Sequence, residues 1–222
     1  MLLRLLNFIG LVFSFAYPYG ASQKLKKYRD ILYTGWIRRR FKTLRGYVRY
    51  KIEIVGSQYI SIGENTNIQE RVRLYAWDTF HEQRFTPEIN IGSDTIIQKD
   101  CFLSAVNKIE IGDRVAVTEH TMILDNIHGD FQDNHLSFTE NSEVPDVFLQ
   151  NAYTRPLSSK GPVIIEDDVH IGMFCTILPG TVIGHHSVIA AHSVVSRKIP
   201  PYSLVAGNPA EVIMTFGRKK RK

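Results

Sequence analysis

A six-residue repeat dominates this sequence and limits the folds that the chain can adopt. From residue 165 an aliphatic residue recurs at every sixth position, at Ile165, Ile171, Ile177, Ile183, Ile189 and Val195. The same period starts earlier at Ile62, Ile91 and Ile111. A period of six fits neither an amphipathic helix nor the alternation of a strand in an open sheet. It predicts a solenoid with faces one hexapeptide wide, in which three faces close a triangular coil and stacked coils bury one aliphatic column.

Length and cysteine content agree with a single elongated body. The 222 residues, 44% of them hydrophobic, are enough for one substantial core. Cys101 and Cys175 each interrupt an aliphatic repeat, so we interpret them as small core or turn residues of a reduced protein.

The first 51 residues form a basic arm. They carry twelve Lys or Arg and one acidic residue, Asp30, a net charge of +11, which leaves −6 for the other 171 residues of a chain whose total is +5. The stretch from Leu2 to Tyr17 is largely apolar but too short for a confident bilayer span, and no small-residue cleavage site follows it. Two interpretations stay open: a helix lying on an anionic membrane at its cytoplasmic face, and a helix packed on the body or on a neighbouring subunit.

We therefore divide the chain into an arm at 1–51, partly helical, a repeat body at 52–209, and a C-terminal cap with a basic tail at 210–222. Two segments break the repeat. Residues 125–162 have no period and are expected to loop out of the body, and such long loops are usually functional. A shorter irregular piece from Trp77 to Glu88 is expected to pack on the first coils or to form an aromatic side wall. After Gly207-Asn-Pro-Ala210 we expect a short helix that covers the last strand edge.

The repeat resembles that of the hexapeptide-repeat acyltransferases, over roughly Ile62 to Met214. The stretch VSRKIPPYSLVAGNPAEVI from Val195 is the most specific part, and it is similar to the end of the repeat body in galactoside and maltose acetyltransferases and their polysaccharide-modifying relatives. The resemblance implies an all-β fold, a left-handed parallel β-helix, with acetyl-CoA as co-substrate and no metal. It also implies a homotrimer with its sites between subunits.

The candidate general base is His128. It stands where the repeat Ile111, Val117, Ile123 fails and the long loop begins, and imidazole suits proton transfer near neutral pH. The segment IGDRVAVTEHTMILDNIHG is similar to the family stretch that ends in a His just before this loop. The resemblance therefore assigns His128 the role of removing the proton from the acceptor hydroxyl.

Four residues are candidates for holding the acceptor. Asn126 stands where the saccharide-modifying branch often has a first His, and Asp125 is expected either to fix the tautomer of His128 or to shape the turn. Ser104 and Asn107 match a region that lines the acceptor pocket in the family, but polarity at a coil corner is the simpler interpretation of both.

By the same resemblance, the coenzyme lies along the C-terminal coils. His170 and Met173 match positions that contact the pantetheine arm, Ala191 follows on the next coil, and Ser196 with Arg197 matches a Thr-Lys pair near the nucleotide end. Relatives often carry arginines where Glu211 and Met214 stand here. Arg218 and Lys219, with Lys220, are candidates to replace them, and a solvated charge run is the alternative interpretation of this tail.

By this resemblance we expect a cytoplasmic O-acetyltransferase that acts on a saccharide hydroxyl in surface polysaccharide biosynthesis. Serine, a nucleotide sugar or a small antibiotic stays open as the acceptor, as does an acyl group larger than acetyl. An inactive β-helix scaffold is the main non-enzymatic alternative. A metal-dependent β-helix enzyme is disfavoured because His186 and His192 are six residues apart and stack on successive faces, and nucleic-acid binding by the arm is not expected.

Overall fold

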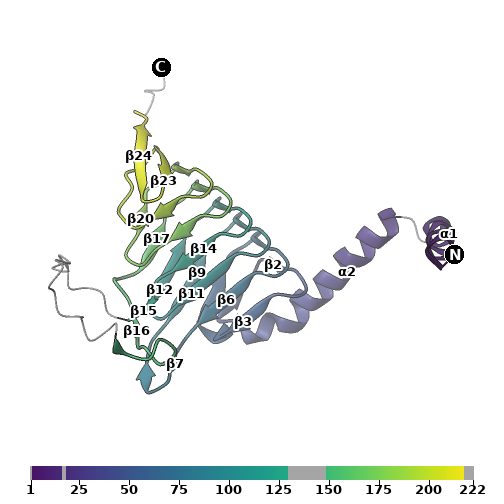
Figure 1. The fold of residues 1–222 in the computed structure, drawn as a ribbon, viewed down its shortest axis with the longest axis horizontal. Coiled ribbons are helices and arrows are strands. Elements are labelled where there is room, and N and C mark those ends of the chain that lie inside the picture. The colour runs from purple at the N-terminus through teal and green to yellow at the C-terminus, as the bar shows by residue number, and fades with distance from the viewer. Residues whose placement is uncertain (1, 17–18, 130–148, 218–222) are drawn as a thin grey trace.

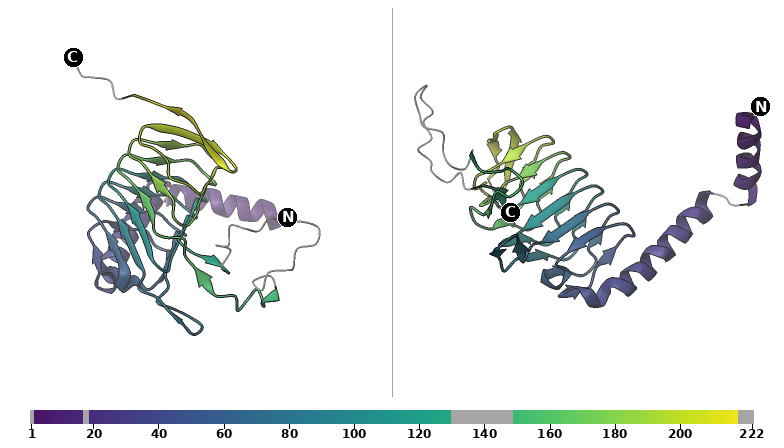
Figure 2. Two further views of the ribbon diagram at one scale, coloured as in Figure 1. Left: turned by 90° about the vertical axis from the view of Figure 1, so that its left-hand side faces the viewer. Right: turned by 60° about the horizontal axis from the view of Figure 1, so that its bottom comes forward.

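The computed structural model describes residues 2–16, 19–129 and 149–217 (Figure 1). Its body is built from three parallel sheets that the chain visits in a fixed rotation, so that each turn of the chain adds one strand to each sheet. Figure 2 shows the strands stacked into a three-sided coil with α2 extending from its N-terminal end. The predominantly parallel β-architecture that the resemblance implies is confirmed.

The strands are short, as a hexapeptide face requires. Sheet A contains β1 (Thr43–Leu44), β4 (Ile60–Ile62), β9 (Glu88–Ile91), β12 (Lys108–Ile111), β17 (Val163–Ile165) and β20 (Val182–Ile183). Sheet B contains β2 (Tyr47–Val48), β5 (Asn67–Ile68), β10 (Ile96–Ile97), β13 (Ala116–Val117), β18 (His170–Ile171), β21 (Val188–Ile189), β23 (Ser203–Gly207) and β24 (Ala210–Thr215). Sheet C contains β3 (Glu53–Val55), β6 (Arg73–Ala76), β11 (Phe102–Ala105), β14 (Met122–Leu124), β19 (Thr176–Ile177) and β22 (Val194–Val195).

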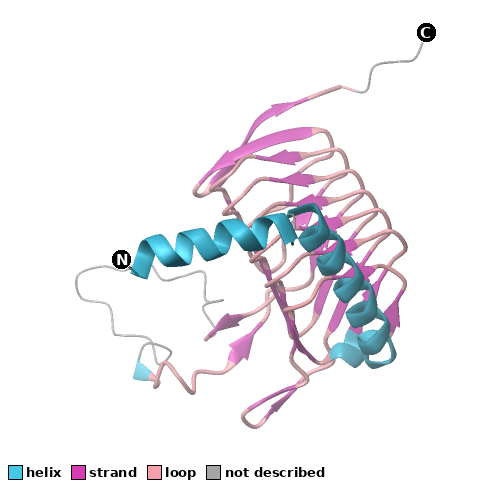
Figure 3. Ribbon diagram, turned by 90° about the vertical axis from the view of Figure 1, so that its right-hand side faces the viewer, coloured by secondary structure: helices cyan, strands magenta, loops and turns pink. Residues whose placement is uncertain are grey.

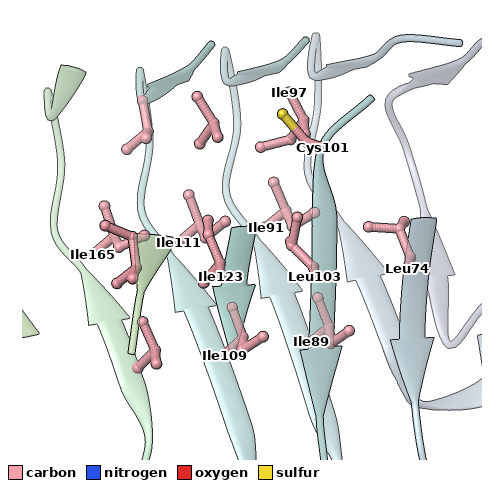
Figure 4. Close-up of a cluster of buried hydrophobic side chains, with 14 of the residues drawn as sticks. Leu74, Ile89, Ile91, Ile97, Cys101, Leu103, Ile109, Ile111, Ile123 and Ile165 are labelled. Carbon is pink, nitrogen blue, oxygen red and sulfur yellow. The ribbon is translucent and has the colours of Figure 1, made fainter. Parts of the chain in front are cut away.

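The aliphatic residues of the repeat form the core. Ile91 pairs in register with Ile111 and Ile111 with Ile165, and these side chains are at most 3% exposed. Figure 4 shows these isoleucines side by side inside the coil, with Leu103 and Ile123 of sheet C facing them. Each buried aliphatic side chain of this size contributes about 1.5–3 kcal/mol relative to exposure, so adjacent coils stabilise one another.

Two of the three corners of the coil, A–B and B–C, place a residue in the left-handed region. At the A–B corner, where the chain passes from sheet A to sheet B, φ lies between 55° and 59° at Asn65, Asp94, Arg114, Asp168, His186 and Tyr202. At the B–C corner it lies between 57° and 70° at Lys51, Arg71, Asp100, His120, Phe174 and His192. This conformation costs non-glycine residues roughly 1 kcal/mol each. The two rows stack from coil to coil, which allows contacts along each row to offset that cost.

Glycine is needed where adjacent coils approach most closely. A Cβ on Gly92 would lie 2.6 Å from the backbone carbonyl carbon of Gly112 in the next coil. Close approach of adjacent coils therefore explains why a small residue follows the aliphatic position of the repeat.

Two helices precede the coil, α1 (Leu2–Ala16) and α2 (Tyr19–Ile37), followed by a short 3-10 turn, Arg38–Arg40. Figure 3 shows α2 beside the first coils, with α1 beyond its far end. Strands β1 and β2 already pair with β4 and β5, so the coil begins ahead of the boundary that we drew at residue 52. A second 3-10 turn, Ser57–Tyr59, connects β3 to β4.

Helix α2 covers the open edge of the first coil. The Thr34 hydroxyl donates to the Val48 carbonyl at 2.7 Å and accepts the Val48 N–H at 3.0 Å. The Asp30 carboxylate accepts the Tyr50 N–H at 3.2 Å. Within the described residues, no single helix is long and apolar enough to cross a membrane. A bent pair, Leu3–Phe15 with Gly20–Arg40, meets that test only jointly.

The C-terminal helix that we expected after Gly207 is wrong, because residues Ala210–Thr215 form strand β24. This strand returns antiparallel along β23, pairing Gly207 with Ala210 and Leu204 with Met214. Strand pairing satisfies the edge of sheet B directly, and the β-branched residues Val212, Ile213 and Thr215 favour an extended backbone.

Candidate functional site

Both aperiodic segments leave the coil at the same corner, the C–A corner between sheets C and A. The first lies between β6 and β9 and contains the hairpin β7 (Thr79–Phe80) and β8 (Gln83–Arg84). The second lies between β14 and β17 and contains β15 (Ile127–His128) and β16 (Leu157–Ser158). Residues 130–148 of this segment lie outside the described residues. Figure 1 shows β7, β15 and β16 together at the same side of the coil.

His128 lies in β15 with an exposed side chain. Its ring meets the Phe80 ring edge-on at 5.4 Å between centroids, and its Nδ1 lies 3.4 Å from the Arg155 carbonyl oxygen. A proton on Nδ1 would be directed at that carbonyl, which assigns the lone pair to Nε2. Among the described residues, Nε2 has no hydrogen-bond partner. This arrangement provides an accessible base at the junction of the two excursions.

The strand that carries His128 is held in place by the Gln83 amide. His128 is directly opposite Leu157 in the β15–β16 pair. The Gln83 side chain donates to the Leu157 carbonyl at 3.0 Å and accepts the Leu157 N–H at 2.8 Å. A second clamp is the Ser158 hydroxyl, which donates to the Gly129 carbonyl at 2.6 Å. The first hairpin therefore fixes the position of the second excursion.

Aromatic rings surround the base. His81 stacks edge-on against Phe80 at 4.5 Å and against Tyr153 at 6.0 Å between centroids. Phe80 and His81 come from the first excursion, and His128 and Tyr153 from the second. Such a cluster can pack against the apolar face of a sugar ring.

Asp125 is fully buried beneath this junction. Its carboxylate accepts the backbone N–H groups of Val106 and Asn107, each at 2.8 Å. Burial raises the pKa of Asp125, and the hydrogen bonds from Val106, Asn126 and Asn107 oppose that rise. Of the two roles that we considered for Asp125, these contacts support shaping the corner, because the Nδ1 of His128 faces Arg155 instead.

The structure brings the other predicted acceptor residues to the same corner. The Asn126 amide donates to the Ser104 carbonyl at 2.9 Å and to the Ser104 hydroxyl at 3.2 Å, and both side chains are nearly buried. The side chain of Asn107 is exposed, and together with Arg84, Phe85, Thr86 and Val106 it lines a pocket of about 310 Å³. An acceptor role for these four residues stays a prediction.

The predicted coenzyme residues occupy two corners of the coil. Met173 and Ala191 are exposed at the B–C corner, beside a stack in which Phe174 lies between His120 and His192 at centroid distances of 4.7 and 5.0 Å. The exposed side chain of His170 lies nearby on sheet B.

Ser196 and Arg197 lie instead at the C–A corner, after β22. The Arg197 guanidinium makes two contacts of 2.9 Å with the Glu211 carboxylate. This cation is thus paired with a carboxylate of the same chain. Arg218 and Lys219 lie outside the described residues.

Among the described residues, no group of three or more His, Cys, Asp or Glu side chains is arranged to hold a metal ion. His186 lies at the A–B corner and His192 at the B–C corner, so the two do not converge in one chain.

Sequence reasoning missed two residues of the site, Gln83 and Arg155. Gln83 positions the strand of His128, and Arg155 supplies the carbonyl that faces its Nδ1. Both lie in segments without a period, so no repeat position marked them. The one sequence signal that could have pointed to these segments is their content of aromatic residues, such as Phe80 and Tyr153.

Residues 162–197 match the family described as bacterial transferase hexapeptide (six repeats). Over 212 residues the chain is 27% identical to the Escherichia coli (strain K12) protein "Putative lipopolysaccharide biosynthesis O-acetyl transferase WbbJ", covering 95% of this chain and 97% of that protein. It is also 49% identical over 63 residues to a 2,3,4,5-tetrahydropyridine-2,6-dicarboxylate N-acetyltransferase of Clostridium perfringens (strain 13 / Type A), covering 28% of this chain and 27% of the relative.

Among solved structures, the chain is similar to a single-residue variant of AntD, an N-acyltransferase from Bacillus cereus, in complex with dTDP-4-amino-4,6-dideoxyglucose and coenzyme A. The TM-score is 0.60 at 25% identity, over 79% of this chain and 82% of that chain. A second AntD structure, with dTDP and 3-hydroxybutyryl-CoA, has a TM-score of 0.63 at 24% identity, over 83% of this chain and 88% of that chain, and it shows the shared fold.

Proposed function

We propose that this chain, a hexapeptide-repeat acyltransferase that uses a coenzyme A thioester, transfers an acetyl group to a hydroxyl of a saccharide in surface polysaccharide biosynthesis. The observation that carries the proposal is the exposed His128 between the two excursions, with Nδ1 directed at a carbonyl and Nε2 without a described partner. The likeness to WbbJ, which extends over 95% of the chain, supports a hydroxyl acceptor on a surface saccharide.

The chemistry follows from the position of the imidazole. Nε2 of His128 takes the proton of the acceptor hydroxyl as its oxygen attacks the thioester carbonyl. The carbon–oxygen bond forms and the carbon–sulfur bond then breaks. The imidazolium returns its proton to the departing thiolate, so no covalent intermediate with the protein is needed. Backbone N–H groups at the site would stabilise the negative oxygen of the tetrahedral intermediate.

The proposal extends to the handedness of the coil, the assembly of subunits and the compartment of the reaction. We infer that the coil is left-handed, as the resemblance implies, and that three copies assemble so that neighbouring subunits complete each site. We also place the reaction in the cytoplasm, where acetyl-CoA would be supplied. The aromatic cluster of Phe80, His81 and Tyr153 would provide a platform for the sugar ring.

A second candidate acceptor is the amino group of an amino sugar. The AntD variant was solved with dTDP-4-amino-4,6-dideoxyglucose and coenzyme A, and its likeness to this chain favours this class. The same base would remove the proton from a protonated or attacking amine. The two candidates differ in the bond formed, an ester or an amide.

The test is a screen with radiolabelled acetyl-CoA against lipopolysaccharide oligosaccharides, neutral sugars, nucleotide-linked amino sugars, serine and a small antibiotic. We expect a labelled saccharide whose acetyl group is released by mild base, as esters are. Label that resists mild base would identify an amide and favour the amino-sugar candidate. Acetyl transfer to serine or to an antibiotic, without transfer to any saccharide, would contradict the proposal.

A further inference from the structure

A basic pocket of about 780 Å³ lies between α2 and the first coils, away from the excursions. Its walls come from α2, from the strand ends of β2 and β5, and from the turn after β10. Six cationic side chains line it, Lys26, Lys27, Arg29, Arg49, Lys51 and Lys99. Two carboxylates, those of Asp30 and Glu70, also face it, so the lining carries a net charge of +4 from these eight residues.

Both carboxylates are already engaged. Asp30 binds Arg29 at 2.6 Å and also accepts the Tyr50 N–H. Glu70 lies 3.3 Å from Arg49 and 3.6 Å from Lys99. Burial alone raises the pKa of Glu70, but its backbone hydrogen bond and the charges of Lys99 and Arg49 lower it on balance. The hydrogen bonds and the two cations together outweigh burial of this carboxyl, so Glu70 is held as a paired anion.

Three cations of the pocket are left over. Lys26, Lys27 and Lys51 have no carboxylate partner among the described residues. Like charges gathered around one cavity repel one another unless an anion enters it. Lys and Arg side chains around a concave site are suited to the oxygens of a phosphate group.

Helix α1, which precedes α2, indicates that this phosphate belongs to a lipid headgroup. Large apolar side chains are exposed along its whole length, including Leu3 at 75%, Phe8 at 63% and Phe13 at 66%. Only two residues, 17 and 18, separate it from α2. An apolar helix joined directly to a basic one is the arrangement of a segment that lies in a membrane interface, with its cations at the lipid headgroups.

We propose that the basic pocket binds the phosphate of an anionic phospholipid headgroup while α1 lies in the bilayer interface. This inference does not depend on the acceptor or on His128. It would place the enzyme at the membrane surface. A free phosphate compound shares the same chemistry, and the test distinguishes the two sources.

The first arm measures cosedimentation of the full chain with vesicles of phosphatidylcholine, with and without phosphatidylglycerol. Binding is expected only with phosphatidylglycerol and should weaken as salt is raised. The variant Lys26→Gln/Lys27→Gln/Lys51→Gln should bind about a hundredfold more weakly. The matched control Lys42→Gln/Lys108→Gln/Lys160→Gln removes the same charge from other surfaces and should bind like the wild type. Equal losses in the two triple variants, or no loss in the first, would overturn the proposal.

The second arm separates a lipid from a soluble ligand. Phe8→Ser/Phe13→Ser should weaken vesicle binding while the pocket itself is untouched. Inorganic pyrophosphate, titrated by calorimetry, should bind only weakly and should not displace the protein from vesicles at physiological salt. Tight pyrophosphate binding that requires Lys26, Lys27 and Lys51, together with unchanged vesicle binding by the α1 variant, would identify a free-phosphate site instead. Circular dichroism and acetyl transfer in solution, both expected to be unchanged, verify that the variants are folded.

Discussion

The imidazole of His128 is expected to accept the proton of the acceptor as the general base. Replacing His128 with Ala should lower kcat by roughly 10²–10⁴, because general-base assistance is lost, while the fold is retained since the side chain is exposed. Steady-state rates with a fixed saccharide acceptor, together with thermal unfolding, measure both effects. His185→Ala at the A–B corner is the control and should stay active. A His128→Ala enzyme of wild-type activity would remove this residue from the mechanism.

Gln83 acts on the same step through Leu157 and should be a positioning residue. Gln83→Ala removes both hydrogen bonds to the Leu157 backbone, so the strand carrying His128 loses its attachment to the first hairpin. We expect kcat to fall about tenfold with the KM for acetyl-CoA unchanged, because misplacement by about an ångström is costly for a base. Gln98→Ala, on sheet B, is the matched control.

A purely structural role for Gln83 would give a different pattern. Unfolding at a lower temperature would then account for the loss, and kcat per folded molecule would equal that of the wild type. Gln83→Glu keeps one acceptor oxygen but faces the Leu157 carbonyl with a negative charge, so it should not restore the rate.

Single residues were predicted unevenly. The end of the repeat marked His128, because the period fails at a definite position, but its Nδ1 partner was not predictable. That partner, the Arg155 carbonyl, comes from a segment whose conformation no period fixes. Asp125 was a candidate for fixing the tautomer of His128 or for shaping the turn. Its contacts to Val106 and Asn107 depend on the stacking of the preceding coil, which no local pattern shows.

At the scale of elements, both ends of the coil need a cap, and α2 provides one with side chains. Thr34→Val keeps the shape of the side chain but leaves the N–H and carbonyl of Val48 without their partner. Unsatisfied buried groups cost about 1–3 kcal/mol each, so urea unfolding should show a loss of that order. Thr34→Ser, which keeps the hydroxyl, should recover most of it. A Thr34→Val protein as stable as the wild type would show that the edge is not sealed in this way.

At the other end, the need for a cap was predicted correctly but its type was not. Covering the last strand edge follows from general physics, whereas the choice between a helix and a strand depends on whether the chain can turn back at Gly207–Pro209 to reach β23. The β-branched residues of β24 were a signal for a strand, but we expected a terminal helix instead.

The corner rows should make stability depend on pH. At the A–B corner, Arg114 makes two contacts of 2.8 Å with the Asp168 carboxylate, and this hydrogen-bonded pair lowers the pKa of Asp168 below its ordinary value of 3.8. A lowered acid pKa stabilises the fold above that ordinary value, and the stabilisation is lost as the pH falls through the folded value. Arg114→Gln should therefore melt a few degrees lower than the wild type at pH 7.

The difference should shrink as the pH falls below the ordinary value of 3.8, because Asp168 then takes up a proton and its charge pair with Arg114 is lost. Calorimetry at several pH values measures this difference in melting temperature. Arg45→Gln, which removes an exposed ion pair with Glu64, is the control. A difference that stays constant down to acid pH would mean that packing of the Arg114 side chain, and not its charge, stabilises the corner.

For the whole molecule, the six-residue period made the architecture of the body predictable from the sequence. An aliphatic residue at every sixth position predicts the three faces and the core column, since a slip of one residue in the register would turn the isoleucines outward. The hexapeptide repeats make identical demands on each coil, so they say nothing about how copies assemble or which acceptor is bound. Those properties come from the corners and excursions, where each residue has its own surroundings.

The proposal that three copies assemble and complete each site between them can be tested by mixing subunits. His128 lies at the C–A corner and Ala191 at the B–C corner, so in one chain the base and this part of the expected coenzyme groove are separated by the width of sheet C. If a neighbouring copy supplies the groove, His128→Ala and Ala191→Trp, each inactive alone, should regain about a quarter of the wild-type activity after unfolding and refolding together, because random trimers pair an intact base with an intact groove that often. Refolding each variant separately is the control, and sedimentation should give three times the 25.4 kDa mass of one chain. If the coenzyme instead lies along sheet C of the chain that supplies His128, every site in the mixture carries one of the two defects, and no activity returns.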